Sequence, residues 1–445
     1  MDRITREEIA QRLITLSPAD ETEVVVLSQA QALTRFTHEN IHQNLRSDST
    51  TVRVRVISER RCGVATTTVT DDAGLQLVLA RALELAHLAP ADPQWPGLPK
   101  PAPLEAAAEN SFFASTAKAT AERRADHVED IFGVSEQHQL WGAGFVSTTA
   151  SEVTVANSHG VLCSYEGSEA LATVKQSGAD ATGYGECTSP NINAISGKNT
   201  ASIAAAKASA TAHPRAVEPG NWTVILEPVP FAELLSYLVG HFSAQAIDEG
   251  ASFLTWDNLN KAHVDPNITL HDDWTHPLAP GMPFDFEGAP RQKLTLFRQG
   301  TAHDIVTDSR WAARLKRPNT GHALPAPNCY GPQPLSITID PGTASLEELI
   351  ASTERGLLIS RFWYIRPVDE RQTIVTGMTR DGTFLIENGQ IKGGVHNLRF
   401  NQSIIGALKK ATLGNTPTRT TGLDYTMVVP AVKLADFNFT SSTSF

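Results

Sequence analysis

The sequence predicts an α+β fold in two domains. The first should pack helices on a mixed sheet, and the second should be mainly antiparallel, barrel-like β structure that carries one key helix. A chain of 445 residues is too long for one ordinary core. Helical and strand-like periods alternate in the first half, whereas strand-like segments dominate the second. Proline and glycine punctuate PRAVEPGN (214–221), so we expect domains at 1–215 and 216–445.

The N-terminal domain begins with TREE (5–8), a capping-box pattern that predicts a helix through Leu16. TVRVRVI (51–57) alternates valine with arginine, which indicates a strand with one buried face. Asp72 is placed to cap a helix whose leucines recur at helical spacing. The remaining expected strands are 23–27, 63–69, 141–148, 151–157 and 170–175. The remaining expected helices are 117–132 and 201–213. The proline-rich segment 89–103 is expected to be a loop.

The C-terminal domain begins with the hydrophobic strand WTVIL (222–226). Pro228 and Pro230 then introduce a helix expected over 231–247, and Gly250 is placed to end it. Five later segments have the composition of strands: LTLFRQG (294–300), LSITID (335–340), GLLISRFWYIR (356–366), QTIVTGMTR (372–380) and GTFLIENGQI (382–391).

Composition narrows the functional class. The net charge is −11 and no Lys/Arg block stands out, which disfavours nucleic acid as a partner. No apolar run approaches the roughly 20 residues of a spanning helix, so no membrane role is expected. The charged N-terminus lacks a signal-peptide apolar region, and we expect a cytoplasmic protein. The cysteines lie far apart with no CxxC pair, and we expect reduced thiols that bind no metal: Cys62, Cys163, Cys187 and Cys329.

HENIH (38–42) matches the HExxH string of zinc peptidases. That motif works on a helix, where two histidines four residues apart share one face and the glutamate activates the zinc-bound water. Here the flanks are rich in Thr, Ser, Asn and Asp, which predicts a hairpin or strand-loop segment. In a strand, residues four apart lie about 13 Å apart, too far for one zinc ion. We expect a polar turn or sheet edge, with a metal site at His38, Glu39 and His42 kept as an alternative.

The helix expected over 231–247 carries a lone histidine, His241. Ser236 lies five residues before it, followed by Tyr237. A zinc peptidase helix needs two neutral imidazoles and a carboxylate base. Serine is a poor zinc ligand, and tyrosine cannot replace a carboxylate base at neutral pH. Taken alone, His241 is expected to be packed or hydrogen-bonded.

Several segments, in this order, resemble the TldD/PmbA metallopeptidases, historically called modulators of DNA gyrase. They are TRFTHENIHQN (34–44), VEPGNWTVILEPVPFAELLSYL (217–238), GMPFDFEGAPRQKLTLFRQG (281–300), SLEELIASTERGLLI (345–359) and TGMTRDGTFLIENGQI (376–391). The order of these segments along the chain is specific to that family.

In the catalytic branch of that family, an HExxxH helix and a cysteine near the C-terminus hold zinc, and the glutamate is the base. An i, i+5 pair on an ideal helix is about 140° apart, so that branch must distort its helix or splay the side chains. The resemblance lays the first histidine on Ser236, the glutamate on Tyr237 and the second histidine on His241. It also implies that the ligand cysteine would lie within 419–432, where this chain has none. The chain therefore resembles the non-catalytic TldE/PmbA branch, in which the zinc site is lost.

The resemblance implies a heterodimer with a TldD-type catalytic subunit that supplies the zinc, while this chain holds no cofactor and is inactive alone. The implied substrate is an unfolded or extended peptide, held by backbone pairing in a chamber between subunits. Homodimerisation of the isolated chain stays open. Two alternatives stand beside this hypothesis: an autonomous peptide-binding or scaffold protein, and an autonomous zinc hydrolase that uses HENIH.

Overall fold

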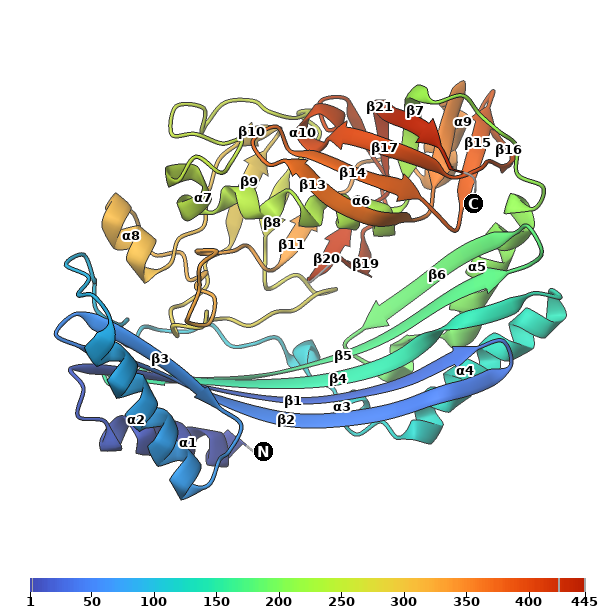
Figure 1. The fold of residues 1–445 in the computed structure, drawn as a ribbon. Coiled ribbons are helices and arrows are strands. Elements are labelled where there is room, and N and C mark those ends of the chain that lie inside the picture. The colour runs from blue at the N-terminus through green and yellow to red at the C-terminus, as the bar shows by residue number, and fades with distance from the viewer. Residues whose placement is uncertain (2, 423–424, 444–445) are drawn as a thin grey trace.

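A computed structural model describes residues 1, 3–422 and 425–443, and it confirms the α+β class. The described residues form three sheets, one from the first half of the chain and two from the second. Figure 1 shows the long N-terminal sheet arched beneath the C-terminal half, with helices on its outer face. None of the described helices is both long and apolar enough to cross a bilayer.

The N-terminal sheet has six strands in the order β3-β2-β1-β4-β5-β6. Its pairings are all antiparallel, which corrects the mixed sheet expected for this domain, because tight hairpins join most of its strands. The strands are β1 (Glu21–Thr37), β2 (Asn40–Ser58), β3 (Arg61–Thr67), β4 (Trp141–Asn157), β5 (Leu162–Ser177) and β6 (Thr182–Ser189). The sequence segments 23–27, 51–57, 141–148, 151–157 and 170–175 are thus pieces of longer strands.

Helices cover the two ends of this sheet. At one end α1 (Arg3–Leu16) and α2 (Asp72–Leu88) pack on Val52, Val54 and Val56 of β2. At the other end α4 (Ala121–Gln137) and α5 (Gly197–Thr211) pack on β4 and β5. Short elements η1 (Glu109–Ser111), α3 (Ala114–Ala117) and η2 (Ile192–Ala194) connect them. Helix α1 begins before the expected cap at Thr5, and the carboxylate that caps α2 is Asp71 rather than Asp72.

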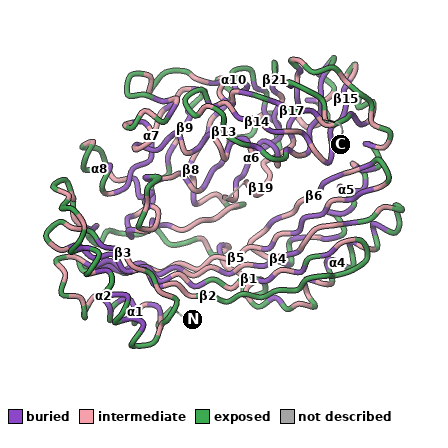
Figure 2. Tube along the Cα trace, in the orientation of Figure 1, coloured by how far each residue is buried: buried purple, intermediate pink, exposed green. Residues whose placement is uncertain are grey.

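The C-terminal half contains two sheets. One has the order β10-β9-β8-β11-β20-β19, and the other has the order β13-β14-β17-β21-β7-β12-β15-β16 with β18 beside β21. Most pairs are antiparallel, as expected, and the exceptions β7–β12 and β11–β20 are parallel. The strands are β7 (Gly220–Leu226), β8 (Leu270–Asp272), β9 (Leu294–Arg298), β10 (Thr301–Ala302), β11 (Ile337–Ile339), β12 (Arg355–Ile359), β13 (Phe362–Asp369), β14 (Ile374–Thr379), β15 (Thr383–Glu387), β16 (Gln390–Gly394), β17 (Leu398–Ser403), β18 (Ala411–Leu413), β19 (Thr418–Thr421), β20 (Thr426–Val429) and β21 (Val432–Ser442). Figure 2 shows the buried segments concentrated inside this half.

The helix expected over 231–247 is broken into α6 (Pro228–Ser236), η3 (Val239–Phe242) and α7 (Ala244–Asp248), which corrects the prediction of one continuous helix. The second break, at Ser243, has its cause far away in the sequence. The backbone at Phe242 and Ala244 exchanges hydrogen bonds with Val306, so the chain leaves the helical path at Ser243. The other C-terminal helices are α8 (Ser309–Leu315), α9 (Leu346–Ala351) and α10 (Ile404–Ala407).

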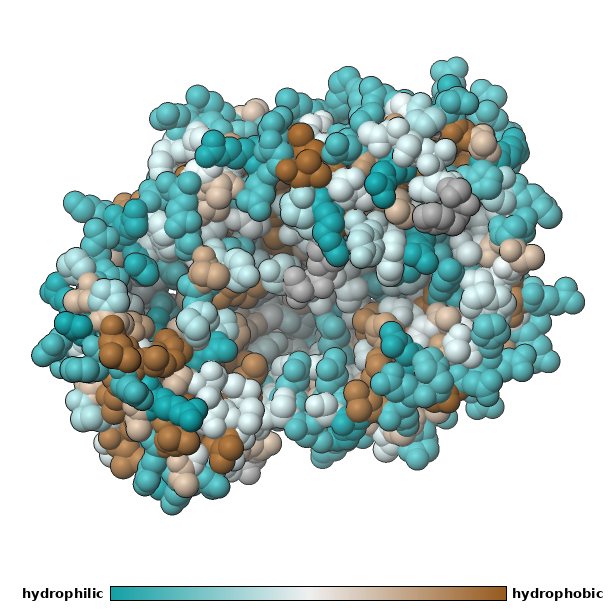
Figure 3. Space-filling model, viewed as in Figure 1, coloured by the Kyte–Doolittle hydropathy of each residue, from teal (hydrophilic) through white to brown (hydrophobic). Residues whose placement is uncertain are grey.

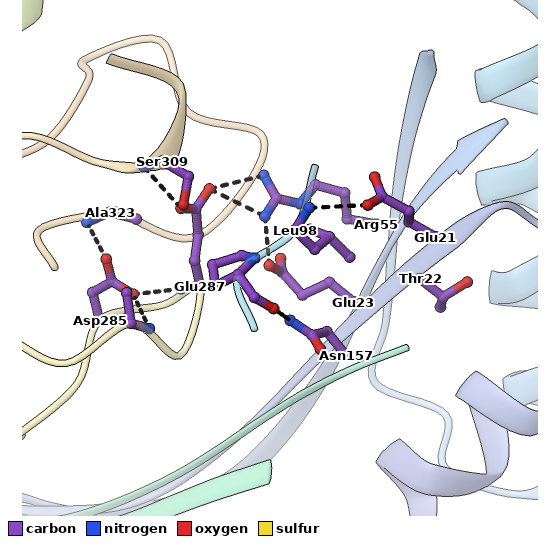
Figure 4. A network of polar contacts seen from close by, with 12 residues as sticks. Glu21, Thr22, Glu23, Arg55, Leu98, Asn157, Asp285, Glu287, Ser309 and Ala323 are labelled. Atoms are coloured by element: carbon purple, nitrogen blue, oxygen red, sulfur yellow. Dashed lines mark hydrogen bonds and ion pairs between the residues drawn. The ribbon is translucent and has the colours of Figure 1, made fainter. Parts of the chain in front are cut away.

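A buried ion network joins the two halves at the α2 end of the sheet (Figure 4). Arg55 of β2 donates hydrogen bonds to Glu23 of β1 and to Glu287 of the C-terminal half, and all three residues are buried. Glu287 also accepts a hydrogen bond from the backbone N–H of Ser309 at the start of α8. One guanidinium thus bridges carboxylates from both halves and fixes their relative position.

Candidate functional site

A cleft of about 580 Å³ lies between the inner face of the N-terminal sheet and the C-terminal half. Side chains of β1, β4, β5 and β6 line one wall, and residues of α6, β13 and the end of β19 line the other. Figure 3 shows the surface hollowed between the two halves. The cleft belongs to both halves of one chain, so the fold itself defines a candidate binding site.

Helix α6 brings Glu233 to the wall of the cleft. Pro228 and Pro230 start this helix, and its apolar side packs into the C-terminal core through Phe231, Leu234 and Leu235. Glu233 lies on another side, partly buried, and accepts a hydrogen bond of 3.2 Å from the backbone N–H of Phe362. Desolvation by burial raises the pKa of Glu233 to about 8, against the opposing effect of the Arg361 charge. Its carboxyl group therefore holds a proton at neutral pH.

Opposite Glu233, a second carboxylate is held by hydrogen bonds from two sheets. Glu186 of β6 accepts bonds of 2.9 Å from the backbone N–H and the hydroxyl of Thr421, from the hydroxyl of Thr420 and from Tyr184. The guanidinium of Arg361 lies 4.2 Å from the centre of the Tyr184 ring. These contacts tie β6 to β19 and hold the cleft walls in register.

The positions that the resemblance assigns to the lost site lie beside this cleft. Ser236 donates a hydrogen bond to the Ala232 carbonyl, and the Tyr237 hydroxyl donates to the Ile365 carbonyl at 2.7 Å. His241 is 8% exposed, and burial lowers its pKa to about 4. All three line a cavity of about 240 Å³. One imidazole, one hydroxyl and one bonded phenol do not fit a zinc ion, which needs nitrogen, thiolate or carboxylate ligands.

The segment expected to lie over this helix does so. A Cβ built on Gly422 would lie 2.5 Å from the Oγ of Ser236. Residues 423–424 of the segment 419–432 lie outside the described residues. Ser236 is the position that the resemblance assigns to the first zinc ligand. A side chain at position 422 would therefore reach it, but this chain has glycine there.

HENIH forms a hairpin, as its flanks predict. His38 occupies the turn between β1 and β2 with φ of 55°, and its ring stacks on Trp141 at 4.5 Å between centroids. Glu39 is exposed beside it, and His42 lies in β2 and lines the cleft. The segment offers no helical face on which two histidines could share a metal. Within the described part of the chain, no three His, Cys, Asp or Glu side chains are grouped as metal ligands.

No cysteine is among the described residues that line the cavity of Ser236, Tyr237 and His241. Cys163 is buried and Cys187 is partly buried, whereas Cys62 and Cys329 are exposed and line a cavity of about 730 Å³ at the Arg55 joint. Burial raises the pKa of Cys163 to about 12, so this thiol stays protonated.

The sequence did not point to Glu186, Glu233 or Arg361, which come from β6, α6 and the residue before β13. No local spacing links them, because long-range packing alone brings them together. A weak signal exists for Glu233, an acidic residue among the apolar positions of α6.

Known proteins share both sequence and fold with this chain. Residues 219–441 match the PmbA/TldA metallopeptidase C-terminal domain, and residues 22–86 match PmbA/TldA metallopeptidase domain 1. A zinc metalloprotease TldD homolog of Saccharolobus solfataricus is 23% identical over 199 residues, which span 42% of this chain and 42% of that protein. TldE from Thermococcus kodakarensis has the same fold, with a TM-score of 0.87, 20% identity and coverage of 98% of this chain and 99% of the other. A proposed modulator of DNA gyrase from Thermotoga maritima aligns with a TM-score of 0.85 at 16% identity over 98% of this chain and all of the other.

Proposed function

The chain belongs to the PmbA/TldD metallopeptidase family, and we propose that it is a TldE-like subunit of a zinc metallopeptidase complex that cleaves unfolded or extended peptides. A TldD-type subunit would supply the zinc and the base, and this chain would complete the substrate chamber. One observation carries the proposal. A cleft that contains charged side chains is built beside α6, while Ser236 and Tyr237 supply neither a metal ligand nor a base.

The borders of the cleft support an extended peptide as ligand. Strands β6, β13 and β19 are each the edge strand of their sheet, and each contributes residues to the cleft. An edge strand offers backbone N–H and C=O groups to a further strand. Pairing through the backbone binds peptides of many sequences, which suits an unfolded substrate.

An apolar patch supports a protein partner. Helices α1 and α2 expose large side chains on the outer surface of the N-terminal half, namely Ile4, Leu16, Leu77, Leu85 and Leu88. Figure 3 shows hydrophobic residues gathered over this region. Exposed apolar patches of this kind mark interaction surfaces, and obligate interfaces usually exceed about 2,000 Å² in total.

Co-purification tests the proposal. The tagged chain, recovered from its native cell, should bring down a homologue that carries HExxxH, identified by mass spectrometry. The mixture should show peptidase activity that a chelator abolishes. Leu85→Asp with Leu88→Asp should weaken the association, whereas Leu162→Asp on β5 should not. A chain that recovers no such homologue, or a mixture without activity, would contradict the proposal.

A second function is favoured by one observation: both walls of the cleft come from this chain alone. An autonomous peptide-binding protein would therefore need no partner. It would bind extended peptides without association with a TldD-type subunit, and sedimentation of the chain with and without that subunit separates the two functions and reveals any homodimer.

A further inference from the structure

A second hollow continues the central cleft toward the far end of the sheet. It has a volume of about 850 Å³ and lies between the β5–β6 hairpin and strands β13, β14 and β17. Four residues line both spaces: Lys175, Trp363, Arg380 and Asp381. We call this second hollow the distal groove. A ligand in the cleft can therefore extend into the groove without leaving the protein surface.

The junction of the two spaces carries an excess of positive charge. Asp381 is buried, and three cations surround it: Arg361 at 3.0 Å, Lys175 at 3.3 Å and Arg380 at 3.7 Å. Arg399 also lines the groove, and the other carboxylate there, Asp180, is paired with His213. One carboxylate among three cations leaves a charge of about +2 around Asp381, which the nearby Glu186 carboxylate reduces to about +1, in a chain whose net charge is −11. Such a focus of positive potential attracts anions.

Arg380 keeps the capacity to bind a ligand. Its side chain is 38% exposed, and at 3.7 Å its Nε makes a charge contact with Asp381 rather than a hydrogen bond. Arg361, by contrast, donates a hydrogen bond to Asp381 and lies against Tyr184. A guanidinium with unused N–H groups can take a carboxylate through two parallel hydrogen bonds.

Aromatic rings form the adjacent wall. The Arg380 guanidinium lies 4.5 Å from the centre of the Trp363 ring, which orients both groups. Tyr364 follows Trp363 in β13 but has φ of 59°, at an irregularity in the pairing with β14. In a regular strand the two rings would point to opposite faces, whereas here both line the groove. This strained backbone conformation at a non-glycine residue is typical of functional positions.

We propose that the distal groove binds a carboxylate of the peptide, with Arg380 and Lys175 as its partners and Trp363 and Tyr364 in contact with the neighbouring side chain. The carboxylate is that of the peptide C-terminus or of an acidic residue. This inference rests on the proposed peptide-binding function and adds a charge preference to it. The groove is built from this chain alone, so the isolated full-length protein should bind such a peptide without a partner subunit.

Fluorescence anisotropy with three labelled peptides tests the proposal. The first is an unstructured hexapeptide without acidic residues and with a free C-terminus; the second is its C-terminal amide; the third is the amide with one internal glutamate. The free acid should bind at least about tenfold more tightly than the amide, because a charge-assisted bidentate contact is lost on amidation. Tight binding of the third peptide would support the groove and assign the carboxylate to a side chain.

Arg380→Gln should remove the preference for the free acid. The matched control is Arg317→Gln, because Arg317 also lies over a tryptophan ring, that of Trp256. Trp256 and Trp363 are each 38% exposed. Melting curves of both variants check the fold. Equal affinity of the chain for all three peptides, an unchanged carboxylate preference in Arg380→Gln, or no binding of any peptide to the isolated chain would overturn the groove. If the ion pairs around Asp381 had only a structural role, Arg380→Gln would shift the melting curve, but the unaltered protein would show no preference for the acid over the amide. Association with a TldD-type subunit is measured separately, so the groove can fail while the proposed function stands.

Discussion

Gly422 faces the hydroxyl of Ser236 so closely that a Cβ on this glycine would lie 2.5 Å from Ser236 Oγ. The end of β19 thus covers the last turn of α6. A side chain at 422 would enter the space where the resemblance places the first zinc ligand. This contact makes reconstruction of the metal site testable.

Zinc affinity should rise in two steps when the site is rebuilt. Ser236→His with Tyr237→Glu supplies two imidazoles and a base, one protein ligand short of the usual catalytic three, and should bind zinc weakly. Adding Gly422→Cys supplies a thiolate and should tighten binding by about tenfold or more. Competition with a chromogenic chelator measures both. The matched control is Gly422→Ser in the same double variant, and equal affinity of the cysteine and serine variants would show that position 422 does not reach the metal.

The unaltered chain should hold no stoichiometric zinc and hydrolyse no peptide, because Ser236 and Tyr237 provide neither ligand nor base. Metal analysis of a tag-free preparation dialysed against a weak chelator, with a fluorogenic peptide assay, measures both properties. Chelator-sensitive activity abolished by His38→Ala would instead assign the chemistry to HENIH, against the hairpin geometry of that segment.

Arg55→Met should destabilise the fold by about 3–5 kcal/mol, because it leaves Glu23 and Glu287 buried without a cation. Urea unfolding measures the change. Arg46→Met is the matched control on the same strand: its pair with Asp48 is exposed, and its loss should cost less than about 1 kcal/mol. Adding Glu23→Gln and Glu287→Gln to Arg55→Met should restore part of the stability. No recovery would argue that Arg55 acts through packing rather than charge.

Stability should depend on pH through Glu233. Its pKa is raised from an ordinary 4.5 to about 8, so the folded state binds this proton more tightly than the unfolded state. The resulting stabilisation is complete below pH 4.5 and is lost as the pH rises through 8. Glu233→Gln should match the parent near pH 5 and exceed it near pH 9 by on the order of 3 kcal/mol, allowing for partial exposure. Unfolding at both pH values, with exposed Glu354→Gln as control, checks this, and a constant difference between the two pH values would contradict it.

The sequence predicted elements wherever one local signal dominates. The strand over 51–57 and the polar turn at HENIH appear as expected, although Arg55 and Ile57 bury the second face of that strand as well. Strand β6 was missed because Gly183 and Gly185 lower its strand propensity. The structure explains them: a Cβ at Gly183 would lie 2.1 Å from the Ala204 carbonyl oxygen, and one at Gly185 would lie 2.3 Å from that of Thr200. These glycines allow α5 to approach the sheet, a tertiary requirement that no local window contains.

The candidate site was predictable only in part. The resemblance located Ser236, Tyr237 and His241, but the departure from the helix at Ser243, just after His241, depends on Val306, more than 60 residues away. The distal groove needed Lys175 and Asp381, which the fold joins across the two halves. The boundary at residue 215 stays a prediction.

The outer edge of β2 is open over half its length. Strand β3 pairs with β2 only over Val52–Ser58, and residues 40–49 are exposed (Figure 2). Along this stretch the outward backbone N–H and C=O groups have no strand neighbour among the described residues, so water must solvate them. Its serines, asparagines and the Arg46–Asp48 pair keep the edge hydrated, which guards against edge-to-edge association of neighbouring molecules. The same ten residues therefore combine two tasks, since His42 among them lines the cleft while its polar neighbours protect the open edge.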